Sequence, residues 1–290
     1  MDSIDERKDV NIEGGQKIID RKNESYIYIC GIEPSRDIVI DDYVTLMPVK
    51  SVANPDDMID CYMKNGNGSE FELGMLISTL RMVTAQLRIT ANDSEKLAIR
   101  TWNSQSICLQ IGALLKCEVS WYFQASDSAD KFNANTRVSL ICPNMYKFPS
   151  EITVIDEVNS SFLEKRLPIA LNLEHDERYR NASNALWCYR IHYRPAIQMS
   201  VLWGGIESLF LIERSIKKNL SIAASRFIGG DDSMVDEIKT LYESRSKAVH
   251  EFKNAEMDIK EKSVNLLHKL LVACVERNCL PNVSQLLNIS

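Results

Sequence analysis

The sequence predicts an α+β domain over residues 1–165, followed by an all-α helical bundle over residues 166–290. Three observations lead to this prediction. Segments rich in β-branched and aromatic residues, which favour strands, are concentrated in the first part. Apolar residues at helical spacing dominate the second part. Three prolines, Pro143, Pro149 and Pro168, lie around the change between the two patterns.

The first part mixes strand and helix patterns. Strands are expected at residues 25–32 and 37–47, which are rich in β-branched and aromatic side chains. An amphipathic helix is expected over residues 70–90, because its apolar residues recur every three or four positions. The other elements expected here are helices at 93–102 and 106–116, and strands at 119–124 and 136–141.

The second part is predicted to be helical throughout. Gly229 and Gly230 stop one helical pattern, and Asp232 or Ser233 is expected to cap the next. A succession of helices with few strand signals favours a bundle. The expected helices cover residues 177–193, 196–218, 221–227, 234–252 and 259–278.

Charge is distributed unevenly between the two parts. The whole chain has a formal net charge of -6 at pH 7. Residues 1–165 contain 17 basic and 25 acidic side chains, a net of -8, and residues 166–290 contain 17 and 15, a net of +2. This balance argues against a protein that coats nucleic acid with a broad basic surface, but it allows a local cationic cleft in the second part.

Nothing in the sequence predicts secretion, a membrane span or a bound metal. The first residues are charged and form no apolar leader, and no run of 18 apolar residues occurs. The eight cysteines contain no Cys-x-x-Cys pair, so we expect reduced thiols in the core of a cytoplasmic protein. Phosphate-loop, dinucleotide-binding, zincin and α/β-hydrolase motifs do not occur, and no cofactor is expected.

The segment LYESRSKAVH, residues 241–250, places a positive charge on an apolar helix face. Arg245 lies in the stripe that includes Leu241 and Val249, and no carboxylate occurs three or four residues away from it. A buried charge without a partner is very unfavourable. The partner of Arg245 must therefore come from elsewhere, as a carboxylate, a second subunit or a phosphate.

His250 likewise has no acidic neighbour one turn away. Its separation from Arg245 by five residues corresponds to about 140° around an ideal helix, so the two side chains do not share one face of a straight helix. Either the helix bends between them, or the site lies where two such helices meet.

Three segments in this part together resemble the HEPN domains, in particular their ApeA-like group. LYESRSKAVH resembles the family string "lYelRSkivHG", the segment VLWGGIESLFL at 201–211 resembles a helix with an "ALE-x-L" core, and SIAASRFIGG at 221–230 resembles "lalRaA-x-llG". The resemblance covers about the last 120 residues. The sequence departs from the family at Glu251, where glycine is usual, which puts the rate or substrate geometry in question.

The resemblance implies an all-α HEPN domain that pairs about a two-fold axis and cleaves RNA without a metal. In such a site Arg245 would grip phosphate oxygens and His250 would act as base or acid, since histidine titrates near neutrality. The substrate's own 2′-OH would be the nucleophile. The resemblance further implies an endoribonuclease in antiphage defence or a toxin, whose first domain senses a trigger ligand or partner.

Other side chains have two interpretations each. Glu207 would either orient Arg245 or form a structural ion pair with a base such as Arg226. Ser246 would either bind RNA or bond to the local backbone. The RNA path is also predicted to include three basic residues whose alternative is a solvated helix face, namely Arg190, Arg194 and Lys247.

Two other functions remain open at this point. The HEPN-like domain could be non-catalytic, with Arg245 and His250 bracing a dimer that binds RNA, nucleotide or a partner protein. Alternatively, the main activity could belong to the first domain, as a ligand sensor controlling the second. The remaining histidines are weaker candidates: His175 in a charged loop, His192 near arginines, and His268 between leucines in the core.

Overall fold

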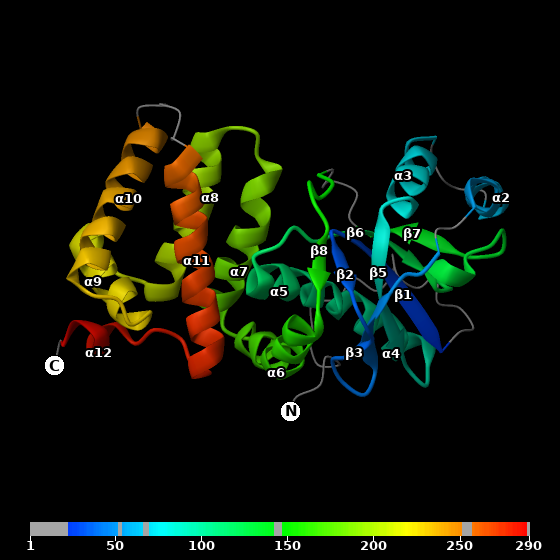
Figure 1. Ribbon diagram of the computed structural model, residues 1–290, viewed down its shortest axis with the longest axis horizontal. Coiled ribbons are helices and arrows are strands. Elements are labelled where there is room, and N and C mark those ends of the chain that lie inside the picture. The colour runs from blue at the N-terminus through cyan, green and yellow to red at the C-terminus, as the bar shows by residue number, and fades with distance from the viewer. Residues whose placement is uncertain (1–22, 52–53, 66–69, 142–146, 251–256, 289–290) are drawn as a thin grey trace. The chain divides into compact units, whose positions relative to one another are not determined.

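The computed structural model describes residues 23–51, 54–65, 70–141, 147–250 and 257–288 (Figure 1). The chain divides into two compact units between Leu167 and Pro168, and residues 113–116 belong to the second of them. The N-terminal unit contains an antiparallel sheet with helices, and the C-terminal unit is mostly helical. At this level the predicted fold class is confirmed.

The N-terminal unit is built on a six-stranded sheet in which every neighbouring pair is antiparallel. A smaller sheet joins β2 (Ile32–Pro34) to β8 (Thr153–Ile155) in parallel. In spatial order the six strands are β3 (Ile38–Val39), β4 (Val44–Pro48), β5 (Val83–Thr90), β1 (Glu24–Cys30), β6 (Ser120–Ala125) and β7 (Val138–Leu140).

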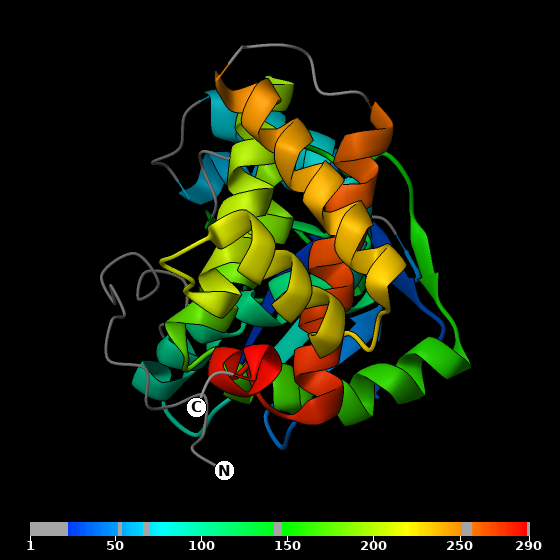
Figure 2. The same ribbon diagram turned by 90° about the vertical axis from the view of Figure 1, so that its left-hand side faces the viewer.

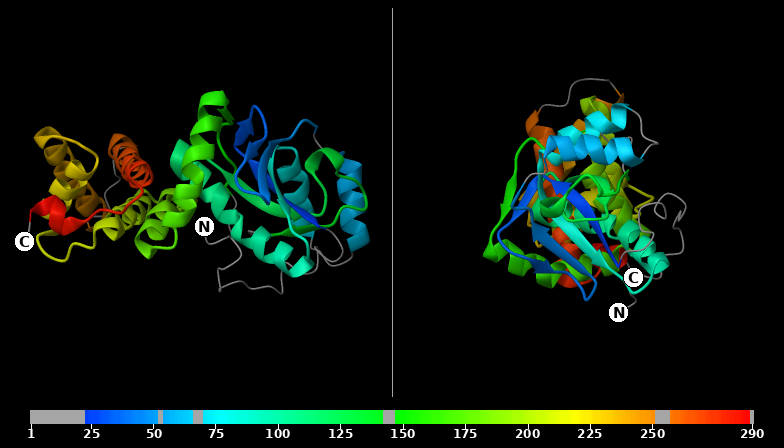
Figure 3. Two further views of the ribbon diagram at one scale, coloured as in Figure 1. Left: turned by 90° about the horizontal axis from the view of Figure 1, so that it is seen from below. Right: turned by 90° about the vertical axis from the view of Figure 1, so that its right-hand side faces the viewer.

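The central strand β1 is buried on both faces. Side chains alternate along a strand, so Tyr26, Tyr28 and Cys30 point to one face while the equally buried Ile27 and Ile29 point to the other. The first face packs against helices α2 (Pro55–Asn65) and α3 (Glu70–Leu80). Helix α4 (Ser94–Asn103), which precedes α5 (Gln105–Leu115), contacts β1 and β5. Figure 3 shows helices on both sides of this sheet.

The single helix predicted over residues 70–90 is wrong. Helix α3 ends at Leu80, and a turn closed by the Met82 N–H donating to Thr79 O at 2.8 Å leads into β5. The apolar residues of this segment fit two periods at once, because Val83 and Leu87 belong to a helical repeat and also to an alternating one. The β-branched content of VTAQLRIT favours the strand, which pairs with β1 and β4.

Each of the first two predicted strands is divided in two. Gly31 separates β1 from β2 with a φ of 94°, and a Cβ at this position would overlap the carbonyl oxygen of Glu118. Asp41 separates β3 from β4, because its carboxylate accepts the N–H groups of Tyr43 and Val44 at 2.7 and 2.8 Å.

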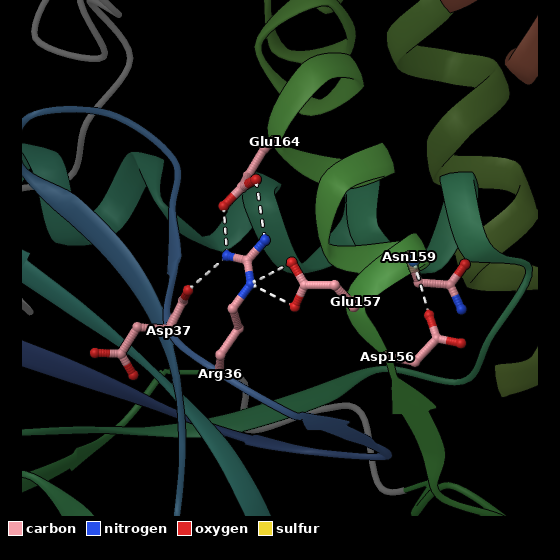
Figure 4. Close-up of polar contacts among 6 residues, drawn as sticks. All are labelled: Arg36, Asp37, Asp156, Glu157, Asn159 and Glu164. Atoms are coloured by element: carbon pink, nitrogen blue, oxygen red, sulfur yellow. Dashed lines mark hydrogen bonds and ion pairs between the residues drawn. The ribbon is translucent and has the colours of Figure 1, made fainter.

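Helix α6 (Glu157–Leu173) was not predicted from the sequence, and Pro168 lies inside it rather than in a linker. Asp156 caps its first turn by accepting the Asn159 N–H at 2.8 Å. Within the N-terminal unit, Arg36 follows β2 and bonds two carboxylates of the helix, Glu157 at 2.9 Å and Glu164 at 2.6 Å (Figure 4). These bonds raise the pKa of Arg36 and lower that of Glu164.

The C-terminal unit is a group of helices arranged around α8. Helix α8 contacts α7, α9, α10 and α11, and Figure 2 shows α8 beside α10 and α11. The helices are α7 (Glu177–Cys188), α8 (Pro195–Phe210), α9 (Ile216–Phe227), α10 (Asp232–His250), α11 (Met257–Arg277) and α12 (Val283–Leu287). Gly205 allows the approach of α7 to α8, since a Cβ there would lie 2.5 Å from the Cβ of Ala185.

The helix predicted over residues 196–218 is also wrong, because it is interrupted after Phe210. Leu211 adopts a left-handed conformation, with φ 48° and ψ 46°, and its N–H donates to Glu207 O at 3.1 Å. Ser215 is left-handed as well and precedes α9, which includes the residues predicted as a separate helix at 221–227. The sequence contains no glycine or proline at this break.

Helix α10 begins with a different cap from either one predicted. The carboxylate of Asp231, not that of Asp232 or the hydroxyl of Ser233, accepts the Met234 N–H at 3.1 Å. The helix then continues without interruption to His250. The predicted extension to residue 252 lies outside the described residues.

Candidate functional site

Arg245 lies on the inner side of α10, where the sequence pattern placed it. Ile238 and Leu241, two turns and one turn before it on the same helix, are 0% and 3% exposed. The Arg245 side chain is 21% exposed, so most of it is removed from solvent. A guanidinium in this position requires compensation of its charge.

The compensating carboxylate belongs to α8. An oxygen of Glu207 lies 3.6 Å from Nη2 of Arg245, and the Glu207 side chain is 31% exposed. Glu207 follows the fully buried Trp203 by one turn, so the contact between α8 and α10 places it against the same face of α10. Two partners were expected for Glu207, and the structure pairs it with Arg245. The other expected partner, Arg226, donates instead to Leu286 O at 2.5 Å.

Two aromatic rings complete a group that we call the Arg245 cluster: Trp203, Glu207, Tyr242 and Arg245. The Tyr242 ring packs edge-on against Trp203, with centroids 5.3 Å apart and planes at 89°. The Arg245 guanidinium carbon lies 5.5 Å from the centroid of the Tyr242 ring. Burial, followed by the negative charge of Glu207, raises the pKa of the Tyr242 phenol.

The hydrogen-bonding capacity of Arg245 is not filled within the described part of the chain. Its Nε is buried and has no hydrogen-bond partner among those residues. The contact with Glu207 is longer than a hydrogen bond, so it balances the charge without fully satisfying the N–H donors. A buried donor of this kind is uncommon in proteins and occurs at sites that receive a ligand, an ion or water.

His250, the second residue of the predicted pair, lies on the same helix as Arg245. The backbone of α10 extends through Lys247 and His250, but the side chains of residues 247–250 lie outside the described residues. Ser246 is half-buried on the same helix, next to Arg245. The backbone alone places Arg245 and His250 about 140° apart around the axis of α10.

The predicted basic helix face formed by Arg190 and Arg194 does not exist. Helix α7 ends at Cys188, Arg190 lies in a 3-10 turn, and Arg194 is extended with φ −88° and ψ 121°. Pro195, which begins α8, disfavours helical geometry at Arg194, the residue before it. The two arginines are therefore not one turn apart on a helix.

The other histidines are not members of the Arg245 cluster. His268 on α11 lies 3.1 Å, through Nε2, from the carbonyl oxygen of Leu114, and burial lowers its pKa. His175 is exposed and lines an open pocket of about 660 Å³ between the start of α7 and the segment before α12. Arg178 in this pocket is already bonded to Asp176 at 3.0 Å.

Comparisons with known proteins give no match: no protein-family model, no curated protein and no solved structure matches this chain. Within the described ranges, no group of three or more acidic, histidine or cysteine side chains could hold a metal ion. No helix in those ranges has the length and apolar character needed to cross a bilayer. Each described cysteine is a free thiol, and Cys142 lies outside these ranges.

Sequence reasoning identified Arg245 and Glu207 but not the part that Tyr242 and Trp203 play beside them. Tyr242 lies within the motif LYESRSKAVH, but the sequence pattern alone gives it no role of its own. Its spacing of three residues before Arg245 was a usable signal, because side chains at that spacing meet on a helix. Trp203 could have been found in the same way, one turn before Glu207 on α8.

Proposed function

We propose that this protein is a metal-independent endoribonuclease of the HEPN type, with its site in the C-terminal unit. The observation that carries the proposal is Arg245, a half-buried cation whose N–H donors are unfilled among the described residues, five positions before His250 on one helix. The resemblance of residues 201–211, 221–230 and 241–250 to the family supports the same chemistry.

The proposed reaction needs only groups that RNA and these two residues supply. A histidine takes the proton of the 2′-OH, whose oxygen then attacks the adjacent phosphorus. Arg245 stabilises the negative charge that develops on the phosphate oxygens. The bond from phosphorus to the 5′ oxygen breaks, that oxygen gains a proton, and the products are a 2′,3′-cyclic phosphate and a 5′-OH.

The geometry of α10 supports a site that two copies of the chain complete. The helix is uninterrupted from Asp232 to His250, so positions 245 and 250 lie about 140° apart around its axis. A second copy of α10 could supply the missing residue across a shared cleft. We therefore propose a homodimer formed through the C-terminal unit, with Ser246 and Lys247 beside the RNA.

The test compares RNA cleavage by the full-length protein and its variants in the presence of EDTA. Arg245→Ala and His250→Ala should each lower the cleavage rate by about 10²–10⁴-fold, the range expected for removal of an acid–base or charge-stabilising group. Arg180→Ala and His175→Ala are matched controls, since both residues are exposed in the same unit, and they should cleave like the wild type. Light scattering should give twice the chain mass of 33.0 kDa.

Three outcomes would contradict the proposal or a part of it. Cleavage that stops in EDTA and returns with a divalent cation would contradict the metal-independent chemistry. Cleavage that persists in folded Arg245→Ala and His250→Ala variants would remove these residues from the site. A mass of about 33 kDa under all conditions would contradict the shared cleft.

The ion pair between Arg245 and Glu207 also supports a second candidate, a non-catalytic HEPN-like module. In that case the pair braces the α8–α10 contact, and the protein binds RNA, nucleotide or a partner protein. Binding of RNA without any cleavage, together with loss of folding stability in Arg245→Ala, would favour this function. A role in antiphage defence or as a toxin in the cytoplasm, with the N-terminal unit sensing a trigger, rests on the family resemblance alone.

A further inference from the structure

The position of Arg245 is determined by a chain of contacts that begins on a third helix. Ser263 of α11 bonds the carbonyl oxygen of Ile259 at 2.9 Å and accepts the Nε1–H of Trp203 at 3.2 Å. Ser263 and Trp203 are both 0% exposed. Trp203 is therefore held in both position and rotation, because its ring is buried and its one polar atom is bonded.

Tyr242 connects this anchored ring to the two charged residues. Its ring meets Trp203 at 89° and lies on the side of the Arg245 guanidinium, 5.5 Å from the guanidinium carbon. Burial, followed by the negative charge of Glu207, raises the pKa of the Tyr242 phenol. Tyr242 thus lies between Trp203 and the Arg245 guanidinium and contacts both.

We propose that Tyr242 is a positioning residue, which fixes the Arg245 guanidinium beside Glu207 so that the N–H donors of Arg245 remain available to a phosphate. This inference rests on the proposed function and names a further residue of the same site. An arginine side chain has about 2 kcal/mol of rotamer entropy, so an unsupported guanidinium samples many directions. Ring packing on one side and the Glu207 charge on another restrict that freedom before the substrate arrives.

The role differs from that of a core aromatic residue in what its removal changes. Tyr242→Leu removes the ring and should lower kcat by about 100-fold while KM changes little, since a misplaced catalytic group acts mainly on the transition state. Tyr242→Phe keeps the ring against Trp203 and loses only the hydroxyl. Its kcat should fall much less than that of the leucine variant, because the ring contacts with Trp203 and the guanidinium remain, so phenylalanine should rescue most of the leucine defect.

Phe227 provides the matched control in the same unit. It is 3% exposed, packs edge-on against Phe210 at 89°, and faces the guanidinium of Arg277 at 5.1 Å, so its surroundings resemble those of Tyr242 without Arg245. Phe227→Leu should lower the melting temperature about as much as Tyr242→Leu and leave kcat unchanged. Unaltered kcat in folded Tyr242→Leu, or an equal loss of kcat in Phe227→Leu, would overturn the positioning role.

A second measurement separates this inference from the proposed function. Titration with inorganic phosphate, followed by calorimetry, reports the site without cleavage. Phosphate should bind the wild type, bind at least tenfold more weakly to Tyr242→Leu, and not bind to Arg245→Ala. If the wild type cleaves no RNA but shows this order of phosphate binding, the ribonuclease fails and the positioning role stands. If phosphate binds Tyr242→Leu as it binds the wild type, or does not bind the wild type at all, the positioning role is wrong.

Discussion

At the scale of single residues, His268 links the pH of the solution to the stability of the C-terminal unit. Burial lowers its pKa, and the charges of Lys116 and Lys269 act in the same direction, while the hydrogen bond to Leu114 O opposes them. The neutral ring is therefore favoured in the folded protein more than in the unfolded chain, where histidine titrates near 6.5.

The sign of the resulting pH dependence follows from which state binds the proton. Below about pH 6.5 the unfolded chain gains a proton that folded His268 resists, so the free energy of unfolding should fall as the pH decreases. The contribution is at most about 1.4 kcal/mol per pH unit. Urea unfolding at pH 7.5 and 5.5 should show a smaller difference in His268→Gln, whose amide can still donate to Leu114 O. An identical difference in the variant and the wild type would show that His268 does not contribute.

The sequence identified the charged residues of the candidate site better than the aromatic ones. Arg245 could be identified because it lies on an apolar stripe without a nearby carboxylate, and a charge buried there without a partner would be very unfavourable. Glu207 was one of two acceptable partners, and only the packing of α8 against α10 selects between the bases available to it. Tyr242 and Trp203 gave no such contradiction, since aromatic residues on an apolar face are expected in any core.

At the scale of elements, the contact between α7 and α8 depends on one glycine. The Cβ of an alanine at 205 would meet Ala185 Cβ at 2.5 Å, Leu267 Cδ2 at 3.3 Å and Ala182 Cα at 3.4 Å. Because Ala185 and Ala182 lie on a helix, the backbone would have to move. The adjacent Gly204 is exposed, and an added Cβ meets nothing within 4 Å.

This pair of glycines allows a matched comparison. Gly205→Ala should destabilise the protein by about 1–3 kcal/mol through overpacking, despite the better helix propensity of alanine. Gly204→Ala should stabilise it by about 0.5–1 kcal/mol, because only the propensity changes. Both values come from urea unfolding monitored by circular dichroism. Equal stability of the two variants would mean that the helices can separate at no cost.

The elements that the sequence predicted wrongly have two physical causes. Where an apolar pattern fits both a helical and an alternating period, as in residues 70–90, the choice depends on neighbouring strands distant in sequence. Where a helix ends without glycine or proline, as after Phe210, the local sequence contains no signal that predicts the end. The long helices α10 and α11 were predicted near their observed starts because their apolar residues keep one helical period.

At the scale of the whole molecule, the two units are not simply consecutive segments of chain. Residues 113–116, at the end of α5 and just after it, belong with the C-terminal unit. Leu114 meets His268, and Nζ of Lys116 lies 2.7 Å from Asn265 and 3.4 Å from Glu261 on α11. A boundary drawn near residue 165 separates these groups from the helices they contact.

Removal of the first 167 residues should therefore do more than delete the N-terminal unit. The fragment 168–290 loses the groups that contact His268, Asn265 and Glu261, and it should melt at a lower temperature than the same unit in the full chain. The pKa of His268, followed by nuclear magnetic resonance, should rise toward its ordinary value as the ring gains solvent. If His268 titrated at the same pH in the fragment and the full chain, residues 113–116 would not be part of the unit's stability.

The left-handed conformation of Leu211 makes position 211 a place where a substitution could increase stability. A left-handed residue with a Cβ costs roughly 1–2 kcal/mol relative to ordinary geometry, and Leu211 recovers little of this through packing because it is 67% exposed. Position 211 ends the helix that carries Glu207, one turn after that residue. The end of this helix is therefore enforced by the surrounding structure against the preference of its own residue. Substitution of Leu211 by glycine or asparagine would remove this cost. During evolution such a change could compensate for a destabilising substitution elsewhere in the unit, without altering any residue of the Arg245 cluster.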